Sequence, residues 1–526
     1  MKKNIVIVGG GISGLTAAAF LTEDKNNNVI LIEQSEKLGG LVGSFEEKGF
    51  VFDSGIRAIE NAGVIFPMLR SLGISVPFKK NKVTLGIEDK FIELVSFESL
   101  IKYQELLVDL FPEEESAIKK IIQLVQNISK YMDVLYGIDN PLFLDFKKDK
   151  EYLTKVVVPW MLKYAVTINK IQKLNKPVND CLLDFTKNQE LIDMITQHFF
   201  TDTPTFFALS YFRLYTDYYY PEGGTATLVN KIEDFIVRNN GIIKTNSEVS
   251  AIDVNGKTIK CKDNSEYKYD KLLWAADLKT LYRNINVSDY TCVNRKKYLE
   301  QKKAILKAKG NDSIFTLYIE SELELDYYMD KCSEHCFYAP KKTGLGSMGL
   351  SKLDLIENKS NKEAVFKWIK EYSEKTTYEI SIPVLRDDKL APEGKSGLIV
   401  STVFDYGLTE YIKENNMYEE FKEFLSQRII SVLTNSIFPN LDENILEYFS
   451  STPITIETRL NNSDGAITGW SFSDKQPVES SLKKIAKSVE TPFDNIYQSG
   501  HWVFTPSGLP TAIITAKVAA DKINKK

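Results

Sequence analysis

The sequence predicts an α/β fold built on a parallel sheet, and three observations support that prediction. Residues 5–8 (IVIV) and 29–32 (VILI) are short, continuous apolar runs, typical of strands buried on both faces of a parallel sheet. Between them, residues 15–21 are mostly small and apolar and favour a helix. Near the other end, a third strand is predicted at 495–499, followed by a helix at about 512–523. Because 526 residues exceed one core, roughly two to four domains are expected.

A glycine-rich turn joins the first strand to the first helix. Gly9, Gly11 and Gly14 fit the pattern G-x-G-x-x-G. Gly9 permits the tight turn, Gly11 lets the backbone approach a pyrophosphate, and Gly14 lets the helix pack closely on the strand. Glu33 ends the second strand, where its carboxylate can accept ribose hydroxyls and would repel a 2′-phosphate. This order of elements predicts a Rossmann-type unit that binds FAD or NAD rather than NADP.

A second glycine pair favours FAD over NAD. Gly39 and Gly40 follow Glu33 closely, and residues 49–55 read GFVFDSG. A nicotinamide dehydrogenase does not need this pair. A long cofactor that lies extended across the sheet does need backbone beside its diphosphate and ring.

These segments resemble the phytoene desaturase-type flavoproteins. That group includes bacterial carotenoid desaturases, plant carotenoid isomerases and retinol saturases, and it belongs to the flavin amine oxidase-like superfamily. The resemblance rests on the glycine motifs and Glu33 and on three later segments: 220–252 (beginning YPEGGT), 458–469 (containing DGAITG) and 495–523 (containing GHWVFTPSGLPT). It extends from residue 4 to about residue 523.

The resemblance implies an FAD site built from both ends of the chain. In relatives, the backbone at the position of Val249 contacts adenine, and the carboxy-terminal motif holds the flavin. Pro510 suits the first turn of a helix, and the start of that helix can stabilise negative charge on a reduced flavin. The expected cofactor-binding residues are Gly9, Gly11, Ile12, Ser13, Gly14, Glu33, Gln34, Gly39, Gly40, Leu41, Gly55, Val249, Gly500, Pro510 and Thr511.

Three positions depart from the family pattern. Leu41 stands where relatives often carry Arg or Lys, and His501 stands where they usually carry an Asp that holds the ribityl chain. Arg57 replaces a His of the saturase branch. By motif position, Arg57 and His501 are the candidates for a catalytic acid or base near the ring, and cofactor positioning is the preferred role for each.

The fold class predicted in full is α/β, with a discontinuous Rossmann-type FAD-binding domain and an inserted α+β substrate domain with a helical lid. The FAD-binding parts are expected at 1–80, 221–290 and 485–526. The substrate domain is expected as a mainly helical part at 81–220 and a mixed part at 291–484. Helices are predicted at 97–110, 112–135 and 415–433, and strands at 377–382 and 397–404.

Two apolar stretches have two interpretations each. Residues 156–168, flanked by Lys155 and containing Trp160, Lys163 and Tyr164, suit a helix at a membrane interface. An ordinary core helix is the slightly favoured interpretation. The aromatic cluster at 211–220 fits an apolar slot beside the flavin and the interdomain core equally well.

Charge and cysteine content exclude several function classes. Lys and Arg total 66 against 71 Asp and Glu, a net charge of −5, which argues against a general nucleic-acid binder. Five scattered cysteines, no signal peptide and no apolar run of about 18 residues predict a cytoplasmic protein, with peripheral membrane association left open. The Cys332–Cys336 segment has one ligand too few for a closed zinc site, so no metal is expected, and a local loop or helix is favoured there.

The leading hypothesis is an FAD-dependent oxidoreductase that acts on carbon–carbon bonds of a hydrophobic isoprenoid or polyene substrate. Desaturation, saturation and flavin-assisted isomerisation use the same scaffold, and the residues do not choose among them. They do not identify the electron acceptor or donor either. The alternatives are a flavin amine oxidase-type enzyme on a polar substrate and a non-catalytic flavoprotein scaffold or lipid carrier.

Overall fold

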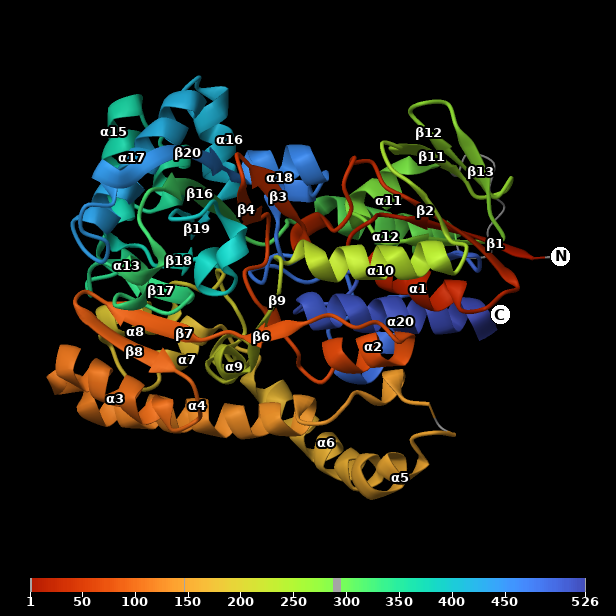
Figure 1. Ribbon diagram of the computed structural model, residues 1–526, viewed down its shortest axis with the longest axis horizontal. Helices are drawn as coiled ribbons and strands as arrows, with labels where there is room; N and C mark the ends of the chain where they lie inside the picture. Colours follow the sequence, from red (N-terminus) through yellow and green to blue (C-terminus); the bar gives the residue numbers. More distant parts are fainter. Residues whose placement is uncertain (1, 146, 287–294, 526) are drawn as a thin grey trace.

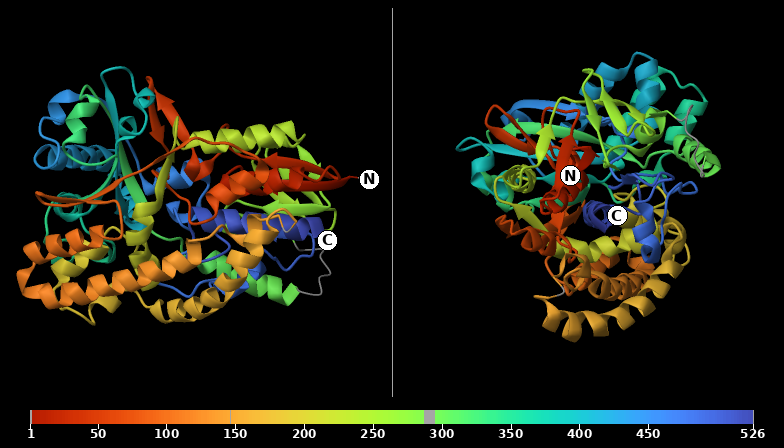
Figure 2. Two further views of the ribbon diagram at one scale, coloured as in Figure 1. Left: turned by 60° about the horizontal axis from the view of Figure 1, so that its bottom comes forward. Right: turned by 90° about the vertical axis from the view of Figure 1, so that its right-hand side faces the viewer.

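The computed structural model describes residues 2–145, 147–286 and 295–525. Cys292 and the predicted boundary at 290–291 lie outside these ranges. A five-stranded parallel sheet forms the centre of the part that carries both termini (Figures 1 and 2). Its order is β10 (Ile242–Lys244), β2 (Asn27–Ile32), β1 (Lys3–Val8), β14 (Lys271–Trp274) and β21 (Ile496–Gln498). The sheet therefore unites three widely separated stretches of the chain.

Three helices cover one face of this sheet. α1 (Ile12–Thr22) packs against both α10 (Ala226–Arg238) and α20 (Leu509–Lys525) (Figure 1). Small buried side chains permit this close packing, among them Ala17, Ala18 and Ala19 of α1 and Ala516, Ala519 and Ala520 of α20. The other face packs on α11 (Leu278–Asn284), α12 (Arg295–Lys307) and a four-stranded sheet of β13 (Glu266–Lys268), β12 (Thr258–Cys261), β11 (Val249–Asp253) and β15 (Ile285–Asn286).

A second, seven-stranded sheet forms the other half of the molecule (Figure 1). All its neighbouring strands are antiparallel except β17 and β7. Its order is β20 (Ile445–Ser451), β16 (Ser313–Ser321), β19 (Ser396–Phe404), β18 (Tyr378–Ser381), β17 (His335–Ala339), β7 (Val83–Ile87) and β8 (Lys90–Leu94). Its largest core includes buried residues from α14 (Lys352–Glu357), α15 (Lys362–Lys375), α16 (Tyr406–Glu414) and α17 (Tyr418–Thr434).

The helical part lies low in Figure 1, with α3, α4, α5 and α6 along the lower edge and α7, α8 and α9 above them. It contains α3 (Ser99–Leu110), α4 (Glu115–Tyr136), α5 (Lys150–Tyr152), a π-helical turn (Leu153–Val157), α6 (Val158–Ile171), α7 (Val178–Leu182), α8 (Gln189–Thr196) and α9 (Thr205–Leu214). α3, α4, α17, β18 and β19 lie where the sequence predicted them. None of the helices in the described ranges combines the length and apolar character that crossing a bilayer requires.

Smaller elements join the two halves. β5 (Ile59–Glu60), β9 (Tyr218–Pro221) and β6 (Phe78–Lys80) form one sheet, and β3 (Ser44–Glu47) pairs with β4 (Phe50–Asp53). The remaining helices are α2 (Ile65–Leu72), α13 (Leu325–Met329), α18 (Pro453–Leu460) and α19 (Ile485–Ser488).

The favoured interpretation of 156–168 as a core helix is wrong for most of its length. Val158, Met161, Leu162 and Val166 of α6 are 57–77% exposed, whereas Thr167, Ile168 and Ile171 near its end are buried. The apolar pattern did not reveal this, because a core helix and a helix that meets an external partner carry the same residues.

Candidate functional site

The turn after β1 leaves space for a ligand. Gly9 has a φ of +108°, and a Cβ there would lie 2.6 Å from the carbonyl oxygen of Ala275. A Cβ on Gly14 would lie 1.9 Å from the carbonyl oxygen of Gly9, so only glycine permits this approach of helix to strand. A Cβ on Gly11 would meet only the Gly39 carbonyl oxygen, at 4.0 Å. The first and third glycines shape the turn, and the second keeps the N-terminus of α1 open.

The second glycine pair lies beside the first motif. Gly39 forms a parallel bridge with Gly11, and Gly39 and Gly40 have φ of +109° and +57°. A Cβ on Gly55 would lie 2.2 Å from the carbonyl oxygen of Leu41. Leu41 thus contributes backbone here, and three chain segments bring backbone to the same place.

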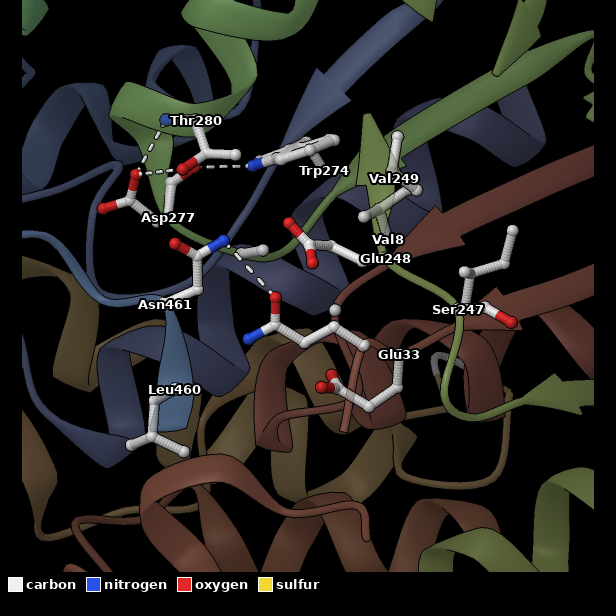
Figure 3. Close-up of a pocket in the computed structure, with 14 residues that line it drawn as sticks. Val8, Glu33, Ser247, Glu248, Val249, Trp274, Asp277, Thr280, Leu460 and Asn461 are labelled. Atoms are coloured by element: carbon white, nitrogen blue, oxygen red, sulfur yellow. Dashed lines mark hydrogen bonds between the residues drawn. The ribbon is translucent and has the colours of Figure 1, made fainter. Parts of the chain in front are cut away.

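A pocket lies at the ends of β1, β2 and β14 (Figure 3). Three carboxylate side chains line it, from Glu33, Glu248 and Asp277. Glu33 accepts hydrogen bonds from the backbone N–H groups of Gly10 at 2.6 Å and Ser35 at 2.8 Å, which fix its carboxylate. Three carboxylates suit the hydroxyl groups of an unmodified ribose, and their charge disfavours an added phosphate.

Other residues of this pocket come from distant parts of the chain. Gln34 and Val249, both expected at the cofactor, line it together with Trp274. Asn461 reaches in from the end of α18 and donates a hydrogen bond to the amide oxygen of Gln34 at 3.3 Å (Figure 3). The sequence reasoning missed Trp274, Asp277 and Asn461, because only tertiary packing places them at this edge of the sheet.

The loop after β21 joins the two ends of the chain. The hydroxyl of Ser13 donates to the hydroxyl of Ser499 at 2.9 Å. Gly500 has a φ of +107°, and its N–H donates to the hydroxyl of Thr515 in α20 at 3.1 Å. Pro510 and Thr511 lie in the first turn of α20, which confirms the predicted proline at a helix start. Ile12 and Ser13 belong to the first turn of α1, so the two helix starts are linked through this loop.

His501 is buried in the same loop. Its Nε2 atom has no hydrogen-bond partner in the described part of the chain, and its ring packs against Trp502 at 5.4 Å between centroids. Burial lowers the pKa of His501 to about 4, and nearby Asp277 opposes that shift. The imidazole is therefore neutral at neutral pH and has a free position toward a ligand.

Arg57 lies in a different electrostatic environment. Its side chain is buried, and Nη2 donates to the hydroxyl of Ser401 in β19 at 2.9 Å. Nε and Nη1 have no hydrogen-bond partner among the described residues. Asp53 does not pair with Arg57, because its carboxylate accepts hydrogen bonds from the hydroxyls of Tyr220 at 2.7 Å and Thr225 at 2.8 Å. The structure thus places Arg57 against the seven-stranded sheet and His501 near Asp277.

A buried acid–histidine pair lies on that sheet, and the sequence reasoning missed it. Nε2 of His335 in β17 lies 3.0 Å from Oε1 of Glu379 in β18. Burial alone would raise the pKa of Glu379, but His335, Arg57 and Arg386 together hold it below the ordinary value. We therefore expect an ionised Glu379. No local pattern signals a pair that two neighbouring strands create.

Several polar side chains between α9 and the seven-stranded sheet lie deep in the molecule and are still partly uncovered. They are Glu60, Tyr136, His198, Tyr211 and Glu379. Because a deep side chain keeps accessible surface only beside an unfilled space, we infer an internal space that these side chains line.

Aromatic rings add to this lining. Phe207 and Phe199 are partly uncovered and contact the ring of Tyr211 at 5.6 and 5.8 Å. Tyr215, Tyr218 and Tyr220 are buried. The aromatic cluster therefore divides. Its first ring, Tyr211, is partly uncovered. Tyr215 and Tyr218 belong to the core that the helical part shares with β7, β8 and β17, and Tyr220 is buried with its hydroxyl on Asp53.

The cysteine cluster belongs to a strand. Residues 332–334 lie in a loop, as the favoured interpretation predicted, and His335 and Cys336 begin β17. Cys332 and Cys336 are buried in the core of the second sheet. In the ranges that the structure describes, no group of three or more His, Cys, Asp or Glu side chains could hold a metal ion.

These features fit a dinucleotide. The open space over Gly11 adjoins the N-terminus of α1, where no side chain of the described residues caps the helix, so its first N–H groups suit a diphosphate. The carboxylate pocket at Glu33 lies at one end of the site. At the carboxy-terminal loop, His501 Nε2 and the buried Ser507 hydroxyl lack partners among the described residues. Buried polar atoms of this kind are costly unless a ligand satisfies them.

Comparisons with known proteins agree with this geometry. Residues 7–72 match a family model described as an NAD(P)-binding Rossmann-like domain. The chain is 22% identical to all-trans-retinol 13,14-reductase of Rattus norvegicus, with 100% of this chain and 86% of that protein covered. It is also 22% identical to phytoene desaturase (lycopene-forming) of Pantoea ananas, with 98% of each covered.

Solved structures match over the whole chain. A triple mutant of putrescine oxidase gives a TM-score of 0.62 at 14% identity and covers 100% of this chain and 99% of that one. Reduced UDP-galactopyranose mutase gives 0.53 at 14% identity, with 100% and 94% covered. At such identities the likeness is one of fold.

Fold and site together define an oxidoreductase with a Rossmann-type dinucleotide-binding unit and a second sheet-and-helix part. Over nearly its whole length the chain is similar to retinol 13,14-reductase and to phytoene desaturase, which agrees with the resemblance predicted from the sequence.

Proposed function

We propose that this protein is an FAD-dependent oxidoreductase that acts on carbon–carbon bonds of a hydrophobic, isoprenoid or polyene substrate. Two features support the proposal: the open backbone at Gly11 with the carboxylate pocket at Glu33, to which both ends of the chain contribute, and the partly uncovered aromatic rings on α9. The names of the relatives, which are reductases and desaturases of retinol and carotenoids, favour the same substrate class.

FAD, when bound, supplies hydride transfer at its ring. The chain would hold its diphosphate with the backbone of Gly9, Gly11, Ile12, Ser13 and Gly14. The adenosine end would lie at Glu33, Gln34 and Val249, in the carboxylate pocket. The remaining proposed contacts are backbone and helix-start residues: Gly39, Gly40, Leu41, Gly55, Gly500, Pro510 and Thr511.

Arg57 and His501 are proposed to position the cofactor rather than to perform the chemistry. Arg57 offers the N–H groups of two nitrogen atoms, Nε and Nη1, to an acceptor on the ring or the substrate. His501 stays neutral and can accept or donate one hydrogen bond through Nε2, where relatives use an acid. Both side chains are buried, and Nε and Nη1 of Arg57 and Nε2 of His501 have no hydrogen-bond partner among the described residues.

The internal space supports binding of an apolar chain. Rings on α9 and on β17 surround it, and such surfaces bind a polyene by contact and exclude water from the reacting carbons. The carboxyl groups of Glu60 and Glu379 and the imidazole of His198 are the polar groups of this lining, and they are where a proton can be exchanged.

We also propose that α6 docks on a lipid surface, from which an insoluble substrate can enter. Its exposed apolar face (Val158, Met161, Leu162 and Val166) has Lys155 and Lys163 nearby, which suits the boundary between headgroups and acyl chains. Location in the cytoplasm, with reversible membrane contact, is the corresponding proposal. The electron donor or acceptor is not assigned.

Anaerobic photoreduction of the purified flavoprotein tests the function. Reoxidation of the reduced protein by a polyene such as all-trans-retinol, with loss of a substrate double bond, supports a saturase. Bleaching of the oxidised protein by phytoene supports a desaturase. Bleaching by putrescine and not by either polyene would refute the proposal in favour of an amine oxidase. A colourless protein that does not take up FAD would refute the whole account.

A further inference from the structure

We propose that Glu60 is the group that exchanges a proton with the substrate. Its carboxyl gives a proton to, or takes one from, a carbon held in the internal space. The inference rests on the proposed function for the identity of the substrate. The protonation of Glu60 can be measured without a substrate.

Glu60 lies where the carboxy-terminal loop meets the internal space. It is the last residue of β5 and pairs with Tyr218 of β9. Its Oε1 atom lies 3.7 Å from the place that a Cβ on Gly508 would occupy. Gly508 directly precedes α20, in the motif proposed to hold the ring. The carboxyl therefore lies between the cofactor side and the aromatic side of the site.

The surroundings of Glu60 contain hydroxyls and an acid but no paired cation. The hydroxyls of Tyr136 in α4, Tyr211 in α9 and Tyr218 in β9 are close enough to feel its charge. Asp217, at the end of the turn after α9, repels it. Among the described residues, no Lys, Arg or His side chain forms an ion pair with Glu60. Arg213 and Lys80 act on Asp217 instead.

Such surroundings favour the neutral acid. Burial raises the pKa of Glu60 to about 7, repulsion by Asp217 adds to the rise, and its own backbone N–H partly opposes it. Both protonation states are then populated near neutral pH, which is the condition for efficient acid–base catalysis. Glu379, the other carboxyl of the internal space, is held ionised by its cationic neighbours and cannot serve as the acid.

The proton from Glu60 and one hydride together supply the two hydrogens that saturation of a double bond requires. When a double bond is saturated, the O–H bond of Glu60 breaks, a C–H bond forms on one carbon, and Glu60 is left as a carboxylate. The other carbon receives the hydride, with its electron pair, that reduced FAD provides. Water, by way of the partly exposed Asp217, restores the proton. Desaturation reverses these transfers, and isomerisation returns the same proton to Glu60.

Infrared difference titration of the flavin-bound protein tests the protonation directly. The wild-type protein should show a carboxyl C=O band that disappears as pH rises through about 7. The band should be missing in Glu60→Gln and should titrate at lower pH in Asp217→Asn, because the repulsion is removed. Glu105→Gln, at an exposed position on α3, is the matched control and should leave the band unchanged. Persistence of the band in Glu60→Gln overturns the inference.

Turnover in D₂O supplies the second readout, with all-trans-retinol and phytoene as probes. Glu60→Gln should lower the rate by about 10²-fold or more, lose its pH dependence near 7 and retain bound FAD, whereas Glu60→Asp should recover part of the rate. A Glu60→Gln protein with the wild-type rate and pH profile also overturns the inference. If the wild-type protein turns over neither probe, the proposed substrate class fails, and the infrared titration still decides whether Glu60 holds the proton.

Discussion

Gly11 offers a substitution that separates folding from cofactor binding. In Gly11→Ala, the new Cβ would meet no atom nearer than 4.0 Å, and the backbone there has φ −72° and ψ 176°, which alanine adopts freely. Loss of a glycine also restricts the unfolded chain. The free energy of unfolding of the FAD-free protein should therefore stay the same or rise by about 0.4–1 kcal/mol.

FAD binding by Gly11→Ala should become weaker, although stability is kept. The methyl group would stand over the N-terminus of α1, where the diphosphate must approach the backbone. Loss of one charge-assisted hydrogen bond costs about 1.5–3 kcal/mol, which corresponds to about 10- to 150-fold weaker FAD binding.

Fluorescence titration with FAD and thermal melting without it measure the two effects. Gly14→Ala should lower stability by about 1–3 kcal/mol, because its Cβ would lie 1.9 Å from the Gly9 carbonyl oxygen. Gly349→Ala, which would meet nothing within 4 Å, should leave FAD binding unchanged and, like Gly11→Ala, keep or slightly raise stability. FAD binding by Gly11→Ala that equals wild type would refute the assignment of this space to the diphosphate.

Three further outcomes are expected. Leu162→Glu should abolish flotation with anionic liposomes and leave the melting temperature unchanged, while Leu353→Glu, at an exposed position on α14, should float like wild type; flotation by Leu162→Glu would exclude α6 as the docking face. Burial depresses the pKa of His501 in the folded state to about 4, so the stability that its neutral form contributes is lost as pH falls from about 6.5 toward 4. His501→Asn should therefore make the melting temperature depend less on pH between pH 7 and 5. An unchanged pH dependence contradicts a buried neutral imidazole. Glu33→Gln should weaken FAD binding about 10-fold, since a neutral amide accepts ribose hydroxyls less strongly, and unchanged affinity would remove Glu33 from the site.

Much of the dinucleotide-binding part could be predicted, because its signals are local. Strand, glycine turn, helix and acid follow one another within 33 residues, and each glycine answers a steric need within a few residues of itself. The helix after Gly508 and the strand before Gly500 were likewise readable from short segments.

The part with the seven-stranded sheet could not be predicted where its contacts join segments far apart in the sequence. β7 and β8 lie in a segment expected to be mainly helical, yet they extend a sheet whose other strands begin at residue 313. The exposed face of α6 carries the same residues as a core helix, so only the position of its neighbours distinguishes the two.

The candidate catalytic groups show the same division. Arg57 was found through its place in a motif, but its partner Ser401 is 344 residues away. Glu60, Glu379 and His335 carried no motif at all.

The sequence by itself determined the local backbone shapes that a dinucleotide needs, since glycine placement and apolar periodicity act over a few residues. The tertiary structure alone decided which acids are buried, which lie beside cations, and that Glu60 has no ion pair with a cation in the described part of the chain. Burial and pairing depend on side chains that packing brings together from distant segments, and it is these surroundings that set the charge a carboxyl carries.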